Sequence, residues 1–150
     1  MLDGVFNHVA RTHPWVGEGL AGDTDWEGHG ELATLHHADP AVRDAVVEIM
    51  LHWLRRGIAG WRLDVAYAVP ADFWADVLAR VRSVFPDAMF LGEVIHGDYS
   101  SIGKAGSLDA VTQYELWKAT WSSLVDVNFW ELAHALERHP VDVLPNTFVG

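Results

Sequence analysis

Arg62 and Asp64 stand at the end of an apolar run that begins at Ile58. Side chains alternate along a strand, so residues two apart share a face, and we expect Arg62 and Asp64 to point the same way. A guanidinium beside a carboxylate favours the ionised form and fixes its orientation. A carboxylate that stays anionic at the open end of a strand can act as a nucleophile. The alternative is a structural ion pair at a strand end.

A second acid, Glu93, lies near the end of the apolar run Ala88–Ile95. An acid in that position is costly to bury unless it is paired or used. The alternative is a solvated acid at the end of a strand. Two carboxyl groups that face each other across a cleft can cleave a glycosidic bond. One attacks the anomeric carbon, and the other, with a raised pKa, protonates the leaving oxygen and then activates water.

Two amphipathic helices separate the strands that carry these groups. The first is predicted to start at Pro40, with Asp39 as its N-cap, and to close at Gly57 in a left-handed conformation. Pro86 ends the second helix. Apolar residues recur at three- and four-residue spacing in both, so these stripes are expected to be buried. Their members are Val42, Val46, Ile49 and Trp53 in the first helix, and Phe73, Trp74, Val77, Leu78, Val81 and Val84 in the second.

Strands and helices alternate along the chain, which we interpret as one partial domain over residues 1–150. Apolar strands separated by amphipathic helices are typical of a parallel sheet covered on both faces. The predicted fold is therefore α/β, a partial (β/α)8 TIM barrel from about the third to the seventh strand. Such barrels need about 250 residues, so this chain is not expected to close one. The further elements expected are a strand at 2–6, a helical turn at 99–104, a strand at 109–113, helices at 115–124 and 129–138 with Asn128 as the second N-cap, and a strand at 145–149.

Residues 9–35 carry little periodicity and are predicted to form a long loop. Loops of this length in compact domains are usually functional or disordered. Asp23 and Asp25 resemble the start of a calcium loop, but the later ligands of the EF-hand pattern are missing. His36 and His37 are adjacent and so should face opposite ways, which favours a loop or sugar contact over a shared metal.

The composition excludes several classes of protein. A formal net charge of −11 argues against binding to nucleic acid or an anionic membrane. There is no cysteine, hence no disulfide or thiolate metal site. No apolar run approaches the roughly 20 residues of a membrane span. No signal peptide is visible in the sequence, which favours a cytoplasmic location. Both ends of the sequence resemble interrupted strands, so we expect the chain to be a piece of a larger protein. Among eight tryptophans, Trp15 and Trp26 fall in the long loop and are candidate platforms for a sugar ring.

Three motifs, in order and with compatible spacing, resemble signatures of the α-amylase superfamily, glycoside hydrolase family 13. They are Asp3-Gly4-Val5-Phe6-Asn7-His8, Gly60-Trp61-Arg62-Leu63-Asp64 and Gly92-Glu93-Val94. Thr147-Phe148-Val149-Gly150 is similar to the lead-in to a fourth. The resemblance covers essentially the whole chain. It implies part of a catalytic barrel whose substrate is an α-glucan or maltooligosaccharide.

By this resemblance Asp64 is the catalytic nucleophile and Glu93 the general acid/base of a retaining mechanism. The two carboxyls of such a site are about 5–5.5 Å apart. Arg62 would hold Asp64, and Asp3 would be a structural acid near Arg62. His8 would contact the sugar at the cleavage subsite.

The resemblance assigns further residues and also has departures. Tyr67 and His96 are assigned to substrate binding, although the family usually has Lys-His where Tyr67-Ala68 stand. Asn7 would be a calcium ligand. Because the segment 9–35 is short for the subdomain that the family inserts there, a structural calcium stays open, and no other cofactor is required. A short signature expected at 32–37 lacks its acid.

The expected function is that of a retaining glycoside hydrolase on α-1,4-glucosidic linkages, of the α-amylase, maltooligosaccharide or cyclodextrin hydrolase type. The family's third acid would follow Gly150, so the chain alone is expected to be inactive. An α-glucan transglycosylase or a sugar isomerase on the same site, or a non-catalytic carbohydrate-binding fragment, are the alternatives. The sequence leaves the oligomeric state open.

Overall fold

The computed structural model describes residues 1–22, 24–138 and 146–147. Its main sheet has five parallel strands in the order β1-β4-β5-β6-β7. The order follows the sequence without reversal, as strands succeed one another around a barrel and not as in a doubly wound sheet. The strands are β1 (Leu2–Gly4), β4 (Gly60–Leu63), β5 (Met89–Gly92), β6 (Ala110–Thr112) and β7 (Asn146–Thr147).

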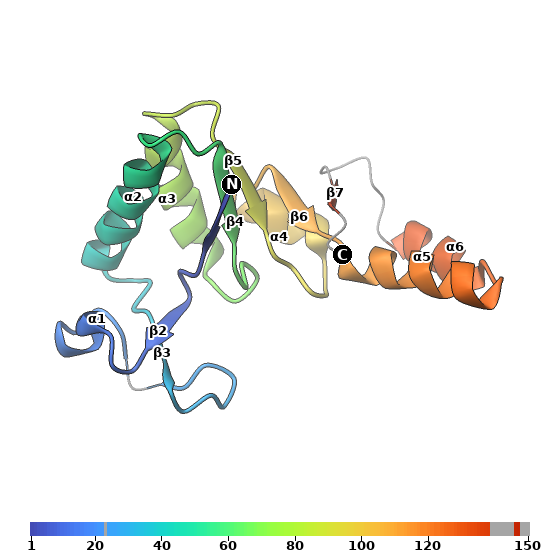
Figure 1. The fold of residues 1–150 in the computed structure, drawn as a ribbon, viewed down its shortest axis with the longest axis horizontal. Coiled ribbons are helices and arrows are strands. Elements are labelled where there is room, and N and C mark those ends of the chain that lie inside the picture. The colour runs from blue at the N-terminus through green and yellow to red at the C-terminus, as the bar shows by residue number, and fades with distance from the viewer. Residues whose placement is uncertain (23, 139–145, 148–150) are drawn as a thin grey trace.

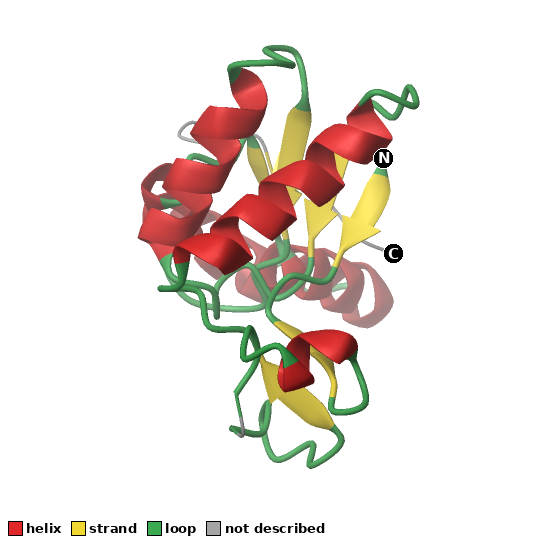
Figure 2. Cartoon of the chain, turned by 90° about the vertical axis from the view of Figure 1, so that its left-hand side faces the viewer, coloured by secondary structure: helices red, strands yellow, loops and turns green. Residues whose placement is uncertain are grey.

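Helices connect consecutive strands of this sheet, as the α/β prediction requires. Figure 2 shows α2 and α3 lying side by side across one face of the strands. In Figure 1 the α5–α6 pair extends away from the other end of the sheet. The helices are α2 (Pro40–Leu54), α3 (Ala71–Arg82), α4 (Tyr99–Ala105), α5 (Tyr114–Asp126) and α6 (Trp130–Arg138).

The predicted caps form as the sequence indicates. The Asp39 carboxylate accepts the Ala41 N–H at 2.8 Å, with Pro40 in the first turn of α2. Gly57 has φ +92°, a left-handed conformation that favours glycine, and so lets the chain turn from the end of α2 at Leu54 into β4 at Gly60. Asn128 Oδ1 accepts the Trp130 N–H at 3.2 Å at the start of α6.

The core lies between the helices and one face of the sheet. Trp61, Leu63 and Phe90 point to this side and are buried, as is the stripe of α3 around Trp74. Arg62, on the opposite face of β4, is only half-buried. The sheet therefore has a well-packed helix side and a more open side, and the open side carries the charged groups.

Two of the residues expected in the core are not there. Trp53, in the last turn of α2, is 42% exposed, and the Arg56 guanidinium lies over its ring at 5.8 Å. Val84 is 51% exposed because α3 ends at Arg82, before it. Helical spacing identifies a stripe but not the point where the neighbouring element stops covering it, which is why both predictions were wrong.

The segment predicted as a loop contains regular structure. β2 (His8–Ala10) pairs antiparallel with β3 (Leu32–Thr34), and α1 (Pro14–Gly17) lies between them in sequence. Figures 1 and 2 show these elements as a small lobe beyond the C-terminal end of β1. None of the helices in the described part of the chain has the length and apolar character needed to cross a membrane.

Candidate active site

The register of the parallel strands brings the predicted acids to one edge of the sheet. Asp3 pairs with Arg62 between β1 and β4, and Leu63 pairs with Gly92 between β4 and β5. Asp64 follows Leu63 at the end of β4, and Glu93 follows Gly92 at the end of β5. A Cβ on Gly92 would lie 2.4 Å from Leu108 Cδ1, so only glycine fits directly before Glu93 without displacing Leu108.

One guanidinium binds all three acids. Arg62 Nη1 contacts Asp3 Oδ1 at 2.7 Å and Asp64 Oδ1 at 2.6 Å, while Arg62 Nη2 contacts Glu93 Oε1 at 2.5 Å. The predicted common direction of Arg62 and Asp64 is therefore observed. We call Asp3, Arg62, Asp64 and Glu93 the carboxylate rim. Three carboxylates around one cation need the burial and geometry that only a rigid backbone provides.

Glu93 also accepts hydrogen bonds from two groups outside the rim. The Val65 N–H donates to Glu93 Oε2 at 3.0 Å, and the Tyr114 hydroxyl donates to Glu93 Oε1 at 3.0 Å. Neither the Tyr114 hydroxyl nor the Val65 amide stands out in the sequence as a partner of Glu93. Tyr114 follows β6, the parallel neighbour of β5, and this adjacency is the signal that could have identified its partner.

The two carboxyls have pKa values shifted in opposite directions. Burial raises the pKa of Asp64, although Arg62 acts against that shift. Burial also acts to raise the pKa of Glu93, but its bonds from Val65 and Tyr114 and the charge of Arg62 outweigh burial and lower it. The sequence predicts the reverse order. The difference arises because Glu93 accepts from Arg62, Val65 and Tyr114, whereas the Asp64 side chain accepts from Arg62.

His8 lies at the start of β2 and stacks on Trp26. Their rings are 5.8 Å apart and 16° from parallel. Asn7 Nδ2 lies 3.3 Å from His8 Nδ1, and Asn7 itself is buried. Trp26 therefore joins His8 as one aromatic surface, whereas Trp15 packs against the core.

Tyr67 and His96 come together on the loops that follow β4 and β5. Their rings are 5.9 Å apart. Burial raises the pKa of Tyr67, and the charges of Glu27, Glu93 and Asp64 add to the rise. These charges place Tyr67 near the rim, and near the turn of the small lobe that carries Glu27.

Asn7, the predicted calcium ligand, is buried beside His8. Hard cations take six to eight oxygen ligands. Asp25, which the sequence offers as a ligand, is paired with Arg11, and Asp23 lies outside the described residues. No group of three or more His, Cys, Asp or Glu side chains within 1–22, 24–138 and 146–147 is arranged to hold a metal. Calcium at Asn7 stays a prediction.

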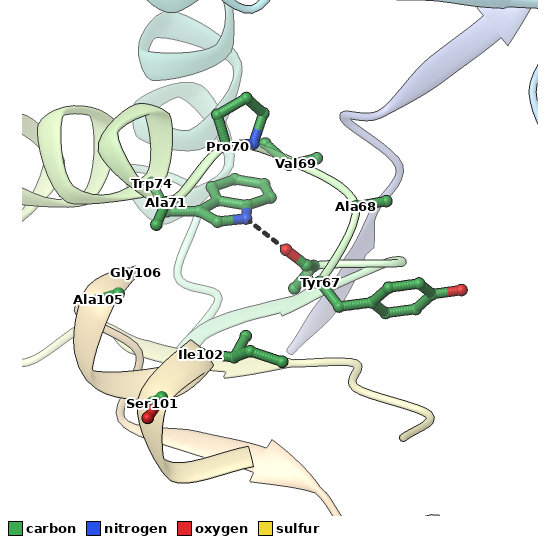
Figure 3. A pocket seen from close by; sticks show the side chains of 11 residues that line it. Tyr67, Ala68, Val69, Pro70, Ala71, Trp74, Ser101, Ile102, Ala105 and Gly106 are labelled. Carbon is green, nitrogen blue, oxygen red and sulfur yellow. Dashed lines mark hydrogen bonds between the residues drawn. The ribbon is translucent and has the colours of Figure 1, made fainter. Parts of the chain in front are cut away.

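A cavity of about 440 Å³ lies between the loop that follows Asp64 and helix α4 (Figure 3). Small apolar side chains form most of its wall. The Trp74 indole N–H donates to the Ala66 carbonyl at 3.1 Å and so ties that loop to α3, as the dashed line in Figure 3 shows. Neither Asp64 nor Glu93 lines this cavity. The paired carboxyls thus lie on the open rim, and the cavity belongs to the loop behind them.

Comparisons with known proteins agree with this geometry. The family model described as the alpha amylase catalytic domain matches residues 26–138. A cyclomaltodextrinase from a Bacillus species is 32% identical over 146 residues, which covers 79% of this chain and 26% of that protein. The intracellular maltogenic amylase of Bacillus subtilis (strain 168) is 33% identical over 118 residues, covering 64% of this chain and 20% of that protein.

Among solved structures, the α-amylase of Geobacillus thermoleovorans complexed with acarbose has a TM-score of 0.75 and 27% identity. The match covers 93% of this chain and 37% of that one. The predicted partial (β/α)8 barrel is thereby confirmed. The chain spans about a quarter or less of the length of the two relatives and over a third of the solved chain.

Proposed function

The chain belongs to the alpha-amylase family, and from that premise we propose that it carries the nucleophile and the acid/base of a retaining glycosidase for α-1,4-linked glucans. One observation carries the proposal. Asp64 and Glu93 are neighbours at the C-terminal ends of adjacent parallel strands, and one guanidinium, Arg62, binds both. Catalytic groups of barrel enzymes come from this edge of the sheet.

The proposed reaction has two steps. In the first, the Asp64 carboxylate bonds to the anomeric carbon, the glycosidic C–O bond breaks, and Glu93 gives its proton to the leaving oxygen. In the second, Glu93 takes a proton from water, the water oxygen bonds to the anomeric carbon, and the bond to Asp64 breaks. The configuration at the anomeric carbon is retained because it is inverted twice.

Substrate binding has to change the ionisation of the free site. Glu93 acts first as an acid, yet its pKa is lowered in the free chain. A sugar bound between Asp64 and Glu93 would exclude water from both carboxyls, and desolvation favours the protonated form. Arg62 can keep Asp64 ionised while Glu93 takes the proton. The proposal therefore expects the pKa of Glu93 to rise when an oligosaccharide binds.

The substrate class rests on the chemistry of the rim and on what the similar proteins are named for. One is a cyclomaltodextrinase, one a maltogenic amylase, and one was solved with acarbose. We assign the stacked His8–Trp26 pair to contact with a sugar ring, because apolar sugar faces pack on aromatic surfaces. Tyr67 and His96 are assigned to the same substrate, and Asp3 to holding Arg62.

A cytoplasmic location is part of the proposal. It is supported by the similarity to a maltogenic amylase named as intracellular. Fractionation of the source cells tests it, and recovery of the protein from the medium would contradict it.

Hydrolysis of maltotriose by a longer polypeptide that carries this chain tests the proposal. Asp64→Asn should lower kcat by about 10⁴-fold or more, and Glu93→Gln by about 10²–10⁴-fold. Asp76→Asn, on the exposed side of α3, is the matched control and should leave the rate unchanged. Normal hydrolysis by Asp64→Asn would remove the nucleophile assignment.

Product analysis separates the related activities. Proton NMR should show the α-anomer released first, because the mechanism retains configuration. Longer oligosaccharides would indicate transglycosylation, and an isomeric disaccharide would indicate isomerisation. Binding of maltotriose without turnover in any polypeptide that carries the chain would favour a non-catalytic binding protein.

A further inference from the structure

Glu93 is bound by more donors than either other acid of the rim. Arg62 Nη2 and the Tyr114 hydroxyl both reach Oε1, and the Val65 N–H reaches Oε2. A carboxylate has about four lone-pair positions. These contacts take three of them, and Asp64 makes a further side-chain contact with the carboxyl. The Glu93 side chain is 11% exposed, so its orientation is set by these donors and not by bulk water.

The three donors to Glu93 differ in how strongly the surrounding structure fixes their positions. Val65 has φ +41°, a left-handed conformation that is rare and costly for a β-branched residue. The loop behind it is fixed by the bond from the Trp74 indole to the Ala66 carbonyl. Tyr114 is the first residue of α5 and is separated from the end of β6 by one residue, so its position is set by the sheet. Arg62 is shared among three acids and is the donor that a bound substrate can most readily redirect.

We propose that Tyr114 is a positioning residue for Glu93, and that its hydroxyl and the Val65 amide form a two-point cradle, with one donor on each carboxylate oxygen, that fixes the orientation of the carboxyl toward the substrate. The inference rests on the proposed function, since it assigns Glu93 the acid/base role. It adds a residue whose effect is exerted through Glu93. The cradle holds the carboxyl in one orientation in both steps, when it gives a proton and when it takes one back.

The groups that face Glu93 come from several elements. Arg62 and Asp64 face it from β4 and its end, Tyr114 from the start of α5, and Tyr67 from the loop after β4. Asp3 acts through Arg62. Of these, only Arg62 and Tyr114 donate to Glu93 from a side chain in the described structure, apart from the contact with Asp64. Tyr114→Phe therefore removes one donor to Glu93, together with the contact of that hydroxyl with Arg62, and keeps the ring and every charge.

The test is the titration of Glu93 in the 150-residue chain, followed by the carbon-13 shift of its side-chain carboxyl. Tyr114→Phe should raise the pKa of Glu93, because a donor to the ionised form is lost. The matched control is Tyr99→Phe, whose hydroxyl donates to the Ile95 carbonyl at 2.7 Å. That control should leave the Glu93 titration as it is in the unchanged chain. An unchanged Glu93 titration in Tyr114→Phe would overturn the proposal.

A reciprocal measurement does not depend on the folding of Tyr114→Phe. Burial raises the pKa of Tyr114, and its bond to Glu93 adds to the rise. Glu93→Gln should therefore lower the pKa of Tyr114, followed by the carbon-13 shift of its ring. The Tyr99 pKa, which burial raises to about 12, should not respond. A Tyr114 titration that ignores Glu93→Gln would also overturn the proposal.

Kinetics distinguish positioning from simple stabilisation. In a polypeptide that hydrolyses maltotriose, Tyr114→Phe should lower kcat about tenfold and leave KM within about twofold, as expected for one lost hydrogen bond to a charged group. The titrations need no turnover, so a failed hydrolysis assay would count against the proposed function and not against the cradle. Equal kcat with a shifted Glu93 titration would show that the cradle exists but does not position the acid.

Discussion

The core behind the carboxylate rim and the α5–α6 hairpin both contain large apolar side chains, but the core buries them and the hairpin leaves most of them exposed. Behind the rim, Phe73, Trp74 and Leu63 are fully buried between α3 and the sheet. In the hairpin the buried set is small: Leu116, Ala119 and Ala135, with Leu132 packed against them. The larger hydrophobic side chains there are exposed: Trp121 63%, Leu124 65%, Val127 81% and Trp130 80%.

The contrast shows what a cluster of like charges requires. Asp3, Asp64 and Glu93 lie around one guanidinium, and such a group is stable only where the backbone cannot relax. The core behind β4 and β5 provides that rigidity. The hairpin carries no comparable charge cluster among its described residues and has little core. Substitutions in the core behind the carboxylate rim should therefore lower the free energy of unfolding far more than similar substitutions on the hairpin.

The largest difference in the free energy of unfolding should be between variants of two tryptophans, Trp74 and Trp121. Trp74→Ala removes a buried ring and the bond to the Ala66 carbonyl, and should lower the free energy of unfolding by about 3–5 kcal/mol. Trp121→Ala should change it by about 0.5 kcal/mol or less, because that ring is already in water. Urea unfolding followed by circular dichroism measures both. Equal losses would mean that the hairpin is covered in solution and that the comparison does not hold.

Two arginines give the next largest difference. Arg62→Met leaves three acids without their shared cation and should lower the free energy of unfolding by about 2 kcal/mol. This loss is smaller than that expected from breaking a fully buried ion pair, because the carboxylate rim is only half-buried. Arg80 also contacts two acids, Asp44 and Asp76, but on the surface. Arg80→Met should cost about 0.5 kcal/mol. A loss for Arg62→Met as small as for Arg80→Met would show that the rim does not depend on its guanidinium.

A smaller effect is expected from His37 as the pH falls. Burial lowers the pKa of His37, whose Nε2 contacts the Phe6 carbonyl at 2.9 Å. A lowered pKa means that the unfolded chain takes up the proton first. The contribution of His37 to stability is therefore full above about pH 6.5 and is lost as the pH falls through the lower pKa of the folded chain. His37→Gln should flatten this dependence.

His36→Gln is the control for that titration, because His36 is exposed and bonds to the Gly19 carbonyl. Its unfolding free energy should follow the same pH dependence as the unchanged chain. A slope that survives in His37→Gln but disappears in His36→Gln would contradict the assignment.

The smallest effect on stability should come from the exposed side of the hairpin. Replacing both Trp121 and Trp130 with Gln should leave the free energy of unfolding within about 0.5 kcal/mol. The same change should reduce self-association, since exposed apolar patches promote it. Sedimentation at increasing protein concentration compares the self-association of the double variant with that of the unchanged chain. Unchanged self-association in the double variant would show that the surface responsible for it lies outside Trp121 and Trp130.

The sequence was sufficient for the architecture and for most of the rim. Strands that end in acids, separated by capped helices, predicted the parallel sheet, and the alternation of side chains predicted that Arg62 and Asp64 share a face. The small lobe was not predicted, because β2 and β3 are three residues each and lack a clear alternation. Short strands of this kind are specified by pairing and not by local pattern.

The support of Glu93 could not be read from the sequence for a different reason. The Val65 amide reaches Glu93 only because Val65 adopts a left-handed φ, which no residue preference predicts for a β-branched side chain. Tyr114 contacts Glu93 through the register of β5 and β6, which depends on the whole sheet. These same contacts explain why the order of the two pKa values differs from the one expected from Arg62 alone.

The central claim is that Asp64 forms the bond to the sugar, and covalent trapping tests it most directly. A 5-fluoro-α-glucosyl fluoride has a leaving group that needs no acid, and its ring fluorine slows release of the glycosyl-enzyme. Peptide mass spectrometry should then find the sugar on Asp64, and no label in Asp64→Asn. A label on another residue, or equal labelling of Asp64→Asn, would contradict the account.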